Sequence, residues 1–108
     1  MAREKFQTLT EQMFYILLCL GQERCGADVM AWISETTGGR VAVGPGTLYN
    51  LLEQFLQAGY IRETKVEGRK RSYVITPAGQ AALEAEVRRL RTLTADYARL
   101  AETEGGAL

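Results

Sequence analysis

The stretch that decides the fold of this chain is Val43-Gly44-Pro45-Gly46-Thr47-Leu48-Tyr49-Asn50-Leu51-Leu52. Proline is favoured in the first turn of a helix, where its missing N–H leaves no hydrogen bond unmade, so the stretch predicts a helix that begins at Pro45 and ends at Ala58-Gly59. Apolar residues recur at helical spacing and give this helix one buried face: Leu48, Leu51, Leu52, Phe55 and Leu56. The opposite face is polar and carries Thr47, Asn50, Gln54 and Gln57, with Tyr49 and Glu53 alongside.

A basic hairpin is predicted directly after this helix. Residues 60–66 and 72–75 are typical of two strands, joined by Glu67-Gly68-Arg69-Lys70-Arg71, which places three consecutive basic residues at the tip. A polar-faced helix beside a basic hairpin suits a protein that enters a DNA groove with one element and holds phosphate with the other. The pattern therefore predicts a winged helix-turn-helix and a transcription regulator.

The remaining segments complete a fold that is mainly α with a small β-hairpin. Thr8-Leu9-Thr10-Glu11 has capping-box spacing, so a first helix is expected to start near Thr8 or Thr10 and to end at Gly21. Residues 22–26 are expected to form a turn, and a second helix begins near Asp28 and stops at Thr37-Gly38-Gly39. A last helix is predicted to run from Pro77 to about Ala101.

Composition restricts the class of protein. The 108 residues carry no net charge, so any DNA-binding charge must be local; residues 62–71 hold five basic and two acidic side chains. The chain has no histidine and two cysteines, which makes a metal site or another cofactor site unexpected. No stretch has the apolar length of a membrane span, and residues 1–7 lack the apolar core of a signal peptide, so we expect a cytoplasmic protein.

The last helix predicts a homodimer. Leu83, Val87, Leu90, Thr94, Tyr97 and Ala101 are spaced by four and three residues in turn, as in a coiled-coil seam. At ~1.5 Å per residue this helix would be roughly 37 Å long, more than a small head can cover. We expect a DNA-binding unit over residues 1–76 and a dimerisation helix over residues 77–108. The expected interface consists of Leu83, Val87, Leu90, Leu93, Thr94 and Tyr97.

Several motifs together resemble the PadR family of transcriptional regulators. They are Gly44-Pro45-Gly46-Thr47-Leu48-Tyr49, then Leu52, Gly59-Tyr60-Ile61, Gly68-Arg69 and Tyr73-Val74-Ile75-Thr76-Pro77-Ala78-Gly79. The resemblance covers about residues 9–83. It implies a winged helix-turn-helix homodimer with a C-terminal dimerisation helix, which represses a nearby operon until a small, often aromatic, ligand or another signal releases it. The chain departs from the family pattern at Ala27 and Ser72, where an aromatic residue is common, and in its short C-terminal region.

Candidate DNA contacts lie on the helix and the hairpin. Thr47, Tyr49 and Asn50 could bond phosphate or base edges; alternatively Thr47 only caps the helix and Tyr49 packs under the hairpin. The helix has no Arg or Lys, so it cannot make the bidentate arginine–guanine contact. The basic candidates for phosphate contact are Lys65, Arg69, Lys70 and Arg71, with Arg3 and Lys5 as weaker ones; a solvated turn is the alternative.

Two further expectations concern ligands and enzymatic activity. Trp32 is a candidate for a pocket that holds a small aromatic or hydrophobic effector, and the alternative is a core residue. An enzyme is not expected, because no nucleophile has an evident base and the Gly44-Pro45-Gly46 cluster lacks the lysine of a phosphate loop. A winged-helix module that binds proteins rather than DNA is the alternative function.

Overall fold

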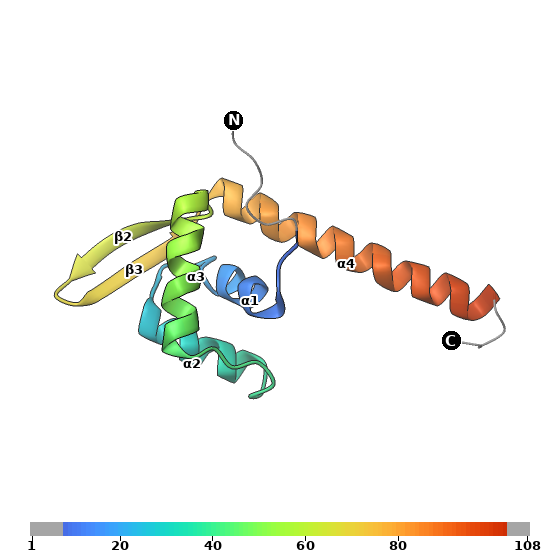
Figure 1. The fold of residues 1–108 in the computed structure, drawn as a ribbon, viewed down its shortest axis with the longest axis horizontal. Coiled ribbons are helices and arrows are strands. Elements are labelled where there is room, and N and C mark those ends of the chain that lie inside the picture. The colour runs from blue at the N-terminus through green and yellow to red at the C-terminus, as the bar shows by residue number, and fades with distance from the viewer. Residues whose placement is uncertain (1–7, 104–108) are drawn as a thin grey trace.

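The computed structural model describes residues 8–103; the weaker candidates Arg3 and Lys5 lie outside them. The described residues form α1 (Glu11–Cys19), β1 (Arg24–Cys25), α2 (Gly26–Thr36), α3 (Pro45–Ala58), β2 (Ile61–Glu67), β3 (Lys70–Ile75) and α4 (Pro77–Thr103) (Figure 1). Helices α2 and α3 form the helix-turn-helix, and residues 61–75 form the wing. The predicted fold class is confirmed.

Helix α1 begins one residue after Thr10. The hydroxyl of Thr10 accepts a hydrogen bond from the N–H of Met13 (3.1 Å), which makes Thr10 the N-cap. Of the two predicted starts, the one at Thr10 is confirmed. The capping box that begins at Thr8 is wrong, because the residue three positions after the true cap is Met13, which has no side-chain acceptor to return the bond.

The predicted boundaries of α3 are confirmed. Pro45 opens the helix and Gly59 closes it in the left-handed conformation (φ 79°), which glycine adopts without steric cost. Its apolar face packs into a core shared with α1 and α2. The largest fully buried side chains of this core are Phe55, Ile16, Leu17, Leu20, Ile33, Leu48 and Leu52. Each contributes about 1.5–3 kcal/mol by leaving water.

The sheet has three strands rather than the predicted two. Residues Arg24 and Cys25, expected in a turn, form β1 and pair antiparallel with Tyr73 and Ser72 of β3, so the strand order is β1-β3-β2. A two-residue strand has no periodicity that sequence could reveal. This short strand attaches the wing to the start of α2.

The hairpin turn is also shorter than predicted. Strand β2 extends to Glu67 and β3 begins at Lys70, so the two-residue turn consists of Gly68, with φ 63°, and Arg69. Lys70 and Arg71 therefore belong to a strand and alternate across the hairpin. A bulge between Glu63 and Lys65 interrupts the pairing of β2 with β3. The placement of three basic residues at the tip is corrected to one, Arg69.

The start of α4 lies against the base of the wing. Thr76 caps the helix, since its hydroxyl accepts the N–H of Gly79 (3.1 Å), and its own N–H donates to the carbonyl of Tyr60 (2.9 Å). Gly79 is buried here, and a Cβ at this position would lie 2.1 Å from the Tyr60 carbonyl oxygen. Only a residue without a side chain fits this approach.

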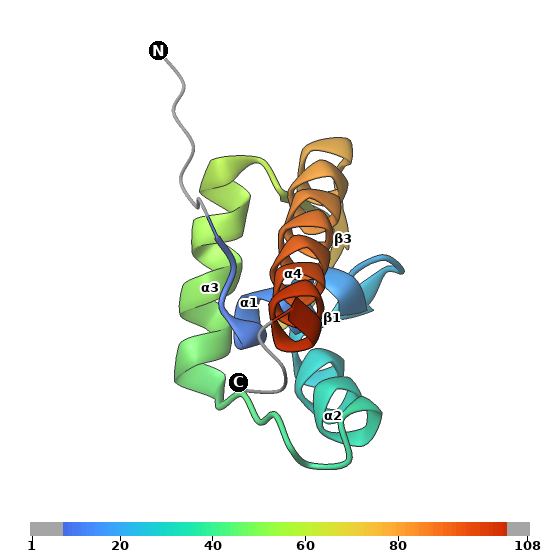
Figure 2. The same cartoon turned by 90° about the vertical axis from the view of Figure 1, so that its right-hand side faces the viewer.

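Helix α4, here called the arm, then extends away from the head, which consists of α1, α2, α3 and the three-stranded sheet. The wing and the far end of α4 lie at opposite ends of the molecule (Figure 1), whose longest dimension is 60 Å. Figure 2 turns the far end of α4 toward the viewer. The first part of α4 packs against α1 and β3. Beyond Leu90, residues 91–100 are all exposed. Among the described residues, no helix is both long and apolar enough to cross a bilayer.

Replacing Gly79 with Ala is expected to destabilise the fold, because the new Cβ would meet backbone atoms that cannot move aside alone. Overpacking of this kind costs about 1–3 kcal/mol or more. Denaturant unfolding at one protein concentration, followed by circular dichroism, measures the change. Gly46→Ala is the matched control, because Gly46 also lies in the first turn of a proline-opened helix and has open space around it. Equal stability of the two variants would contradict the role of Gly79.

Candidate nucleic-acid interface

The exposed side of α3 begins at its first turn. Thr47, Tyr49 and Asn50 are all exposed, as predicted for a face that meets DNA. Gly44 is the N-cap and no side chain bonds the free N–H groups of this helix end, so Thr47 does not act as a cap. The face is open to a ligand from the first turn onward.

Side-chain hydrogen bonds arrange the next turns of this face. The amide of Gln54 donates to Asn50 Oδ1 (3.3 Å), and the amide of Gln57 donates to the carboxylate of Glu53 (3.4 Å). Glu53 is the one charged residue of α3. This exposed face of α3, here called the recognition face, consists of Thr47, Tyr49, Asn50, Glu53, Gln54 and Gln57. It is polar with one negative charge, and its oxygen acceptors suit N–H donors such as the exocyclic amines of bases.

Tyr49 lies over the first residue of α2. A Cβ at Gly26 would be 2.8 Å from the Tyr49 hydroxyl oxygen and 2.9 Å from a ring carbon, so Gly26 is needed to admit the ring. The Tyr49 side chain remains 49% exposed. It is thus neither wholly free nor buried beneath the wing, and it joins the two helices of the helix-turn-helix at the surface.

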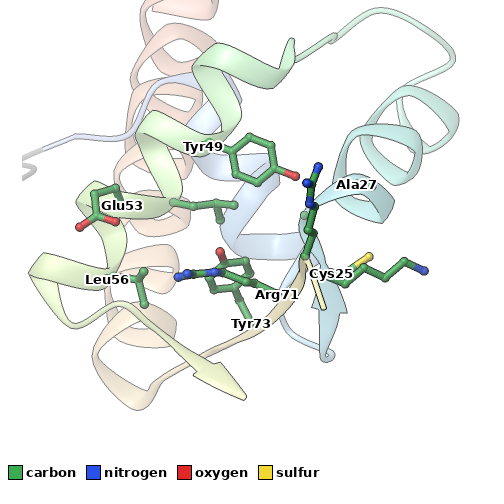
Figure 3. Close-up of a pocket in the computed structure, with 11 residues that line it drawn as sticks. Cys25, Ala27, Tyr49, Glu53, Leu56, Arg71 and Tyr73 are labelled. Atoms are coloured by element: carbon green, nitrogen blue, oxygen red, sulfur yellow. The ribbon is translucent and has the colours of Figure 1, made fainter. Parts of the chain in front are cut away.

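A pocket of about 460 Å³, here called the wing pocket, separates α3 from the wing. Figure 3 shows Tyr49 and Glu53 of α3 on one side and Arg71 and Tyr73 of β3 on the other, with Cys25 and Ala27 at its edge. The pocket is lined by Cys25, Gly26, Ala27, Tyr49, Leu52, Glu53, Leu56, Arg69, Lys70, Arg71 and Tyr73. The structure thus brings the predicted contacts Tyr49, Arg69, Lys70 and Arg71 together.

The basic side chains of the wing differ in their surroundings. Arg71 pairs with Glu63 across the hairpin (3.3 Å), and Lys65 is 3.9 Å from Glu67. Arg69 and Lys70 have no ion pair within residues 8–103. Exposed ion pairs contribute little to stability, so Lys65 and Arg71 can exchange their carboxylates for phosphates, while Arg69 and Lys70 have no carboxylate to release among the described residues.

Tyr73 is a pocket residue that the sequence did not mark as a site. It is 4% exposed and lies at the floor of the wing pocket. Burial raises the pKa of the Tyr73 phenol above its usual value, and the negative charge of the nearby Glu63 raises it further. The phenol therefore stays protonated at neutral pH and can donate a hydrogen bond. The two-residue alternation of β3, which places Tyr73 on the same side as Arg71, could have identified it.

The other candidate residues lie away from the wing pocket. Trp32 is half-buried against the core, and the guanidinium of Arg24 lies 5.4 Å from its ring centroid. Cys19 is fully buried and burial raises its pKa to about 11, while the Cys25 thiol donates to Asp28 (3.3 Å). No group of three potential ligands is arranged for a metal ion among the described residues.

The residues of the expected dimer seam occupy two environments. Leu83 is buried in the core of its own chain and Val87 is half-buried, so the near part of the seam packs within the head. Thr94 is exposed, as are the large apolar side chains of the far part: Leu90 (41%), Leu93 (51%), Tyr97 (60%) and Leu100 (38%). The exposed apolar stripe is therefore confined to residues 90–100.

Comparison with known proteins gives matches over most of the head. Residues 16–85 match the PadR-like family of transcriptional regulators. The chain is also 33% identical over 69 residues to an uncharacterised 37.1 kDa protein in transposon Tn4556 of Streptomyces fradiae. The match covers 64% of this chain and 19% of that protein, so the chain spans about a fifth of this relative.

Solved structures share the fold. A transcriptional regulator from Clostridium thermocellum superposes with a TM-score of 0.71 at 21% identity, covering 80% of this chain and 88% of that one. A PadR family regulator from Eggerthella lenta gives 0.72 at 18% identity, covering 88% and 81%. Bacillus subtilis PadR in complex with operator DNA gives 0.61 at 23% identity, covering 68% and 46%. With residues 16–85 matched to the family, this chain belongs to the PadR-like transcriptional regulators.

Proposed function

We propose that this protein is a homodimeric DNA-binding regulator that acts in the cytoplasm and represses transcription by occupying an operator. The observation that carries the proposal is the wing pocket, which has Tyr49 and Glu53, beside the polar face of α3, on one side and the basic residues of the wing on the other. The helix face would read base edges in the major groove, and the wing would hold the adjacent backbone. Occupancy of a promoter needs only binding, so repression is the simplest consequence.

Family and fold support DNA binding. The chain belongs to a family of transcriptional regulators, and a protein of the same fold, Bacillus subtilis PadR, has been solved with operator DNA. We assign DNA contact to Thr47, Tyr49 and Asn50 on α3 and to Lys65, Arg69, Lys70 and Arg71 on the wing. A small aromatic or hydrophobic effector near Trp32 is a separate proposal. Trp32 does not line the wing pocket, so such an effector would bind outside it.

A homodimer would cover the apolar stripe of the arm. Next to the stripe, a groove of about 360 Å³ runs between α1 and α4, and Phe14, Tyr15 and Leu90 line it. At its wall the buried carboxylate of Glu86 accepts the N–H of Leu9 (3.2 Å) and pairs with Arg89. Exposed apolar surface beside an apolar groove fits a second copy of this chain, with residues 77–103 acting as the dimerisation helix.

Replacing both Arg69 and Lys70 with Ala is expected to weaken binding to every duplex by a similar factor, because phosphate contacts carry no sequence information. The slope of log affinity against log salt should fall by roughly one unit for each phosphate that the variant no longer neutralises. Fluorescence anisotropy with a selected and a random duplex measures both effects. The control is Arg88→Ala with Arg91→Ala, which removes the same charge from exposed positions on α4. Unchanged salt slopes in the wing variant would refute phosphate contact there.

Replacing Asn50 with Ala should act on sequence choice instead. Loss of a base contact costs about 1–3 kcal/mol on the preferred duplex and little on random DNA. The measurement is the ratio of the two affinities, using a duplex selected by the wild-type chain from a randomised pool. Gln57→Ala, in the last turn of the same helix, serves as the control. If Asn50→Ala lowers both affinities equally, Asn50 does not read bases.

Introducing Asp at both Leu90 and Tyr97 is expected to dissociate the dimer, because two charges would be buried in an apolar interface at a cost of several kcal/mol. Sedimentation velocity at micromolar concentration reports the assembly state. Operator affinity should fall steeply, since two half-sites are no longer bound by one linked object.

The matched control for the arm carries Asp at Thr92 and Ala95. It adds the same charges to the same exposed segment, at positions outside the apolar stripe. The control should sediment as the wild type does. A dimer that survives the Leu90 and Tyr97 substitutions would mean that another surface makes the assembly.

A further inference from the structure

The hydroxyl of Tyr73 is an unused hydrogen-bond donor at the floor of the wing pocket. The residue is only 4% exposed, and within residues 8–103 no side chain or backbone group forms a hydrogen bond with its hydroxyl. Figure 3 shows the ring standing at the back of the pocket with its oxygen directed toward α3. Among the described residues, the Tyr73 hydroxyl is not one of the fully buried side-chain oxygens that lack a partner, so it is reached from the pocket. It can therefore donate a hydrogen bond to a ligand that enters the pocket.

A second set of donors comes from the start of α2. This eleven-residue helix has Cys25 as its N-cap, with no side chain bonding the free N–H groups, and Gly26 and Ala27 line the wing pocket. The N-terminal end of a helix carries partial positive charge and attracts anions. Because Gly26 has no side chain, the Tyr49 ring can lie against this end of α2. The Tyr49 hydroxyl then lies beside Gly26, 2.8 Å from where a Cβ would be.

The charges around the pocket favour an anion at its mouth. Arg69, Lys70 and Arg71 line it from the wing, against one lining carboxylate, that of Glu53. The Arg71 guanidinium is shared with Glu63, which lies outside the lining, and Asp28 accepts the Cys25 thiol nearby. Three cations against one lining anion leave a positive local balance in a chain that is neutral overall.

We propose that the wing pocket receives a single backbone phosphate of the bound DNA, with the Tyr73 hydroxyl and the start of α2 as neutral donors and the wing cations around them. This rests on the proposed function and adds one particular phosphate to it. A DNA phosphate is favoured over a free one because the pocket lies between the recognition face of α3 and the basic wing, where a strand must pass if both touch the duplex.

The test is Tyr73→Phe, which keeps the buried ring and removes one donor. Affinity should fall by about tenfold for selected and random duplexes alike, because the variant cannot donate a hydrogen bond to the charged acceptor. The salt slope should stay unchanged, because a phenol releases no counterion. That separates Tyr73 from Arg69 and Lys70, whose removal lowers the slope. Tyr60→Phe, which removes a phenol that lines neither the wing pocket nor the groove between α1 and α4, should bind DNA as the wild type does.

A methylphosphonate scan identifies the phosphate. Duplexes that carry one neutral methylphosphonate at successive positions should show one position per half-site where the wild type loses affinity and Tyr73→Phe loses little more. Wild-type affinity in Tyr73→Phe, or equal sensitivity of both proteins at every position, would overturn the inference while DNA binding itself stands. Failure of the wild type to bind any duplex would overturn the proposed function as well.

Titration with inorganic phosphate tests the other source of the same chemistry. If submillimolar phosphate binds the free protein and Tyr73→Phe abolishes this without affecting DNA affinity, the pocket holds a free phosphate and the DNA assignment is wrong. Weak phosphate binding together with the affinity loss on DNA supports the inference. Thermal unfolding of Tyr73→Phe at the wild-type temperature confirms that the comparison involves folded protein.

Discussion

The backbone contact between the start of α4 and the base of the wing is the constraint on which the rest of the structure depends. Gly79 lies so close to the Tyr60 carbonyl that no Cβ fits between them, and Thr76 donates to the same carbonyl. The hydroxyl of Thr76 also reaches back to the carbonyl of Gly59, where α3 ends. Since backbone atoms cannot repack as side chains do, the end of α3, the wing and α4 are held in one geometry.

This geometry connects the candidate DNA surface to α4, the proposed dimerisation helix. The wing pocket lies between α3 and the hairpin, and the end of α3, the hairpin and the start of α4 meet at this junction. A second tie, from Glu86 to the N–H of Leu9, holds the arm against the segment before α1. Pairing with Arg89 lowers the pKa of Glu86, so this tie is ionised at neutral pH. The separation of two DNA-reading helices in a dimer would follow from these contacts.

Sequence predicted the elements whose ends are marked by residues with restricted backbones. Pro45 and Gly59 bound α3 as expected, and Thr76 and Pro77 open α4. It missed β1, because two residues cannot show a period. The sequence also placed Arg69, Lys70 and Arg71 together at the tip of the hairpin. Where the turn ends depends on which residues of the two strands pair, and sequence alone does not show this pairing. Lys70 and Arg71 consequently differ in the neighbours they meet.

The candidate site shows the same division. Tyr49, Arg69, Lys70 and Arg71 were chosen from residue type and position, and the fold brings them to one pocket. Tyr73 could not be chosen in that way, because a tyrosine in a strand is ordinarily a core residue, and its ring is indeed buried. Its open hydroxyl depends on three segments meeting: β3, α3 and the start of α2. Likewise, Leu83 continues the heptad spacing of the arm but is buried in the core, because the head covers the near part of α4.

Local charge explains how a neutral chain could bind DNA selectively. Non-specific affinity rises with every phosphate that a cation neutralises, and it competes with recognition of the correct site. Here acidic residues lie beside the cations: Glu63 pairs with Arg71, Glu67 is near Lys65, and Glu53 is on the recognition face. Each carboxylate reduces the attraction to random DNA. In the proposed complex, neutral donors such as the Asn50 amide and the Tyr73 phenol would carry a larger share of the binding, and such donors depend on geometry more than on charge.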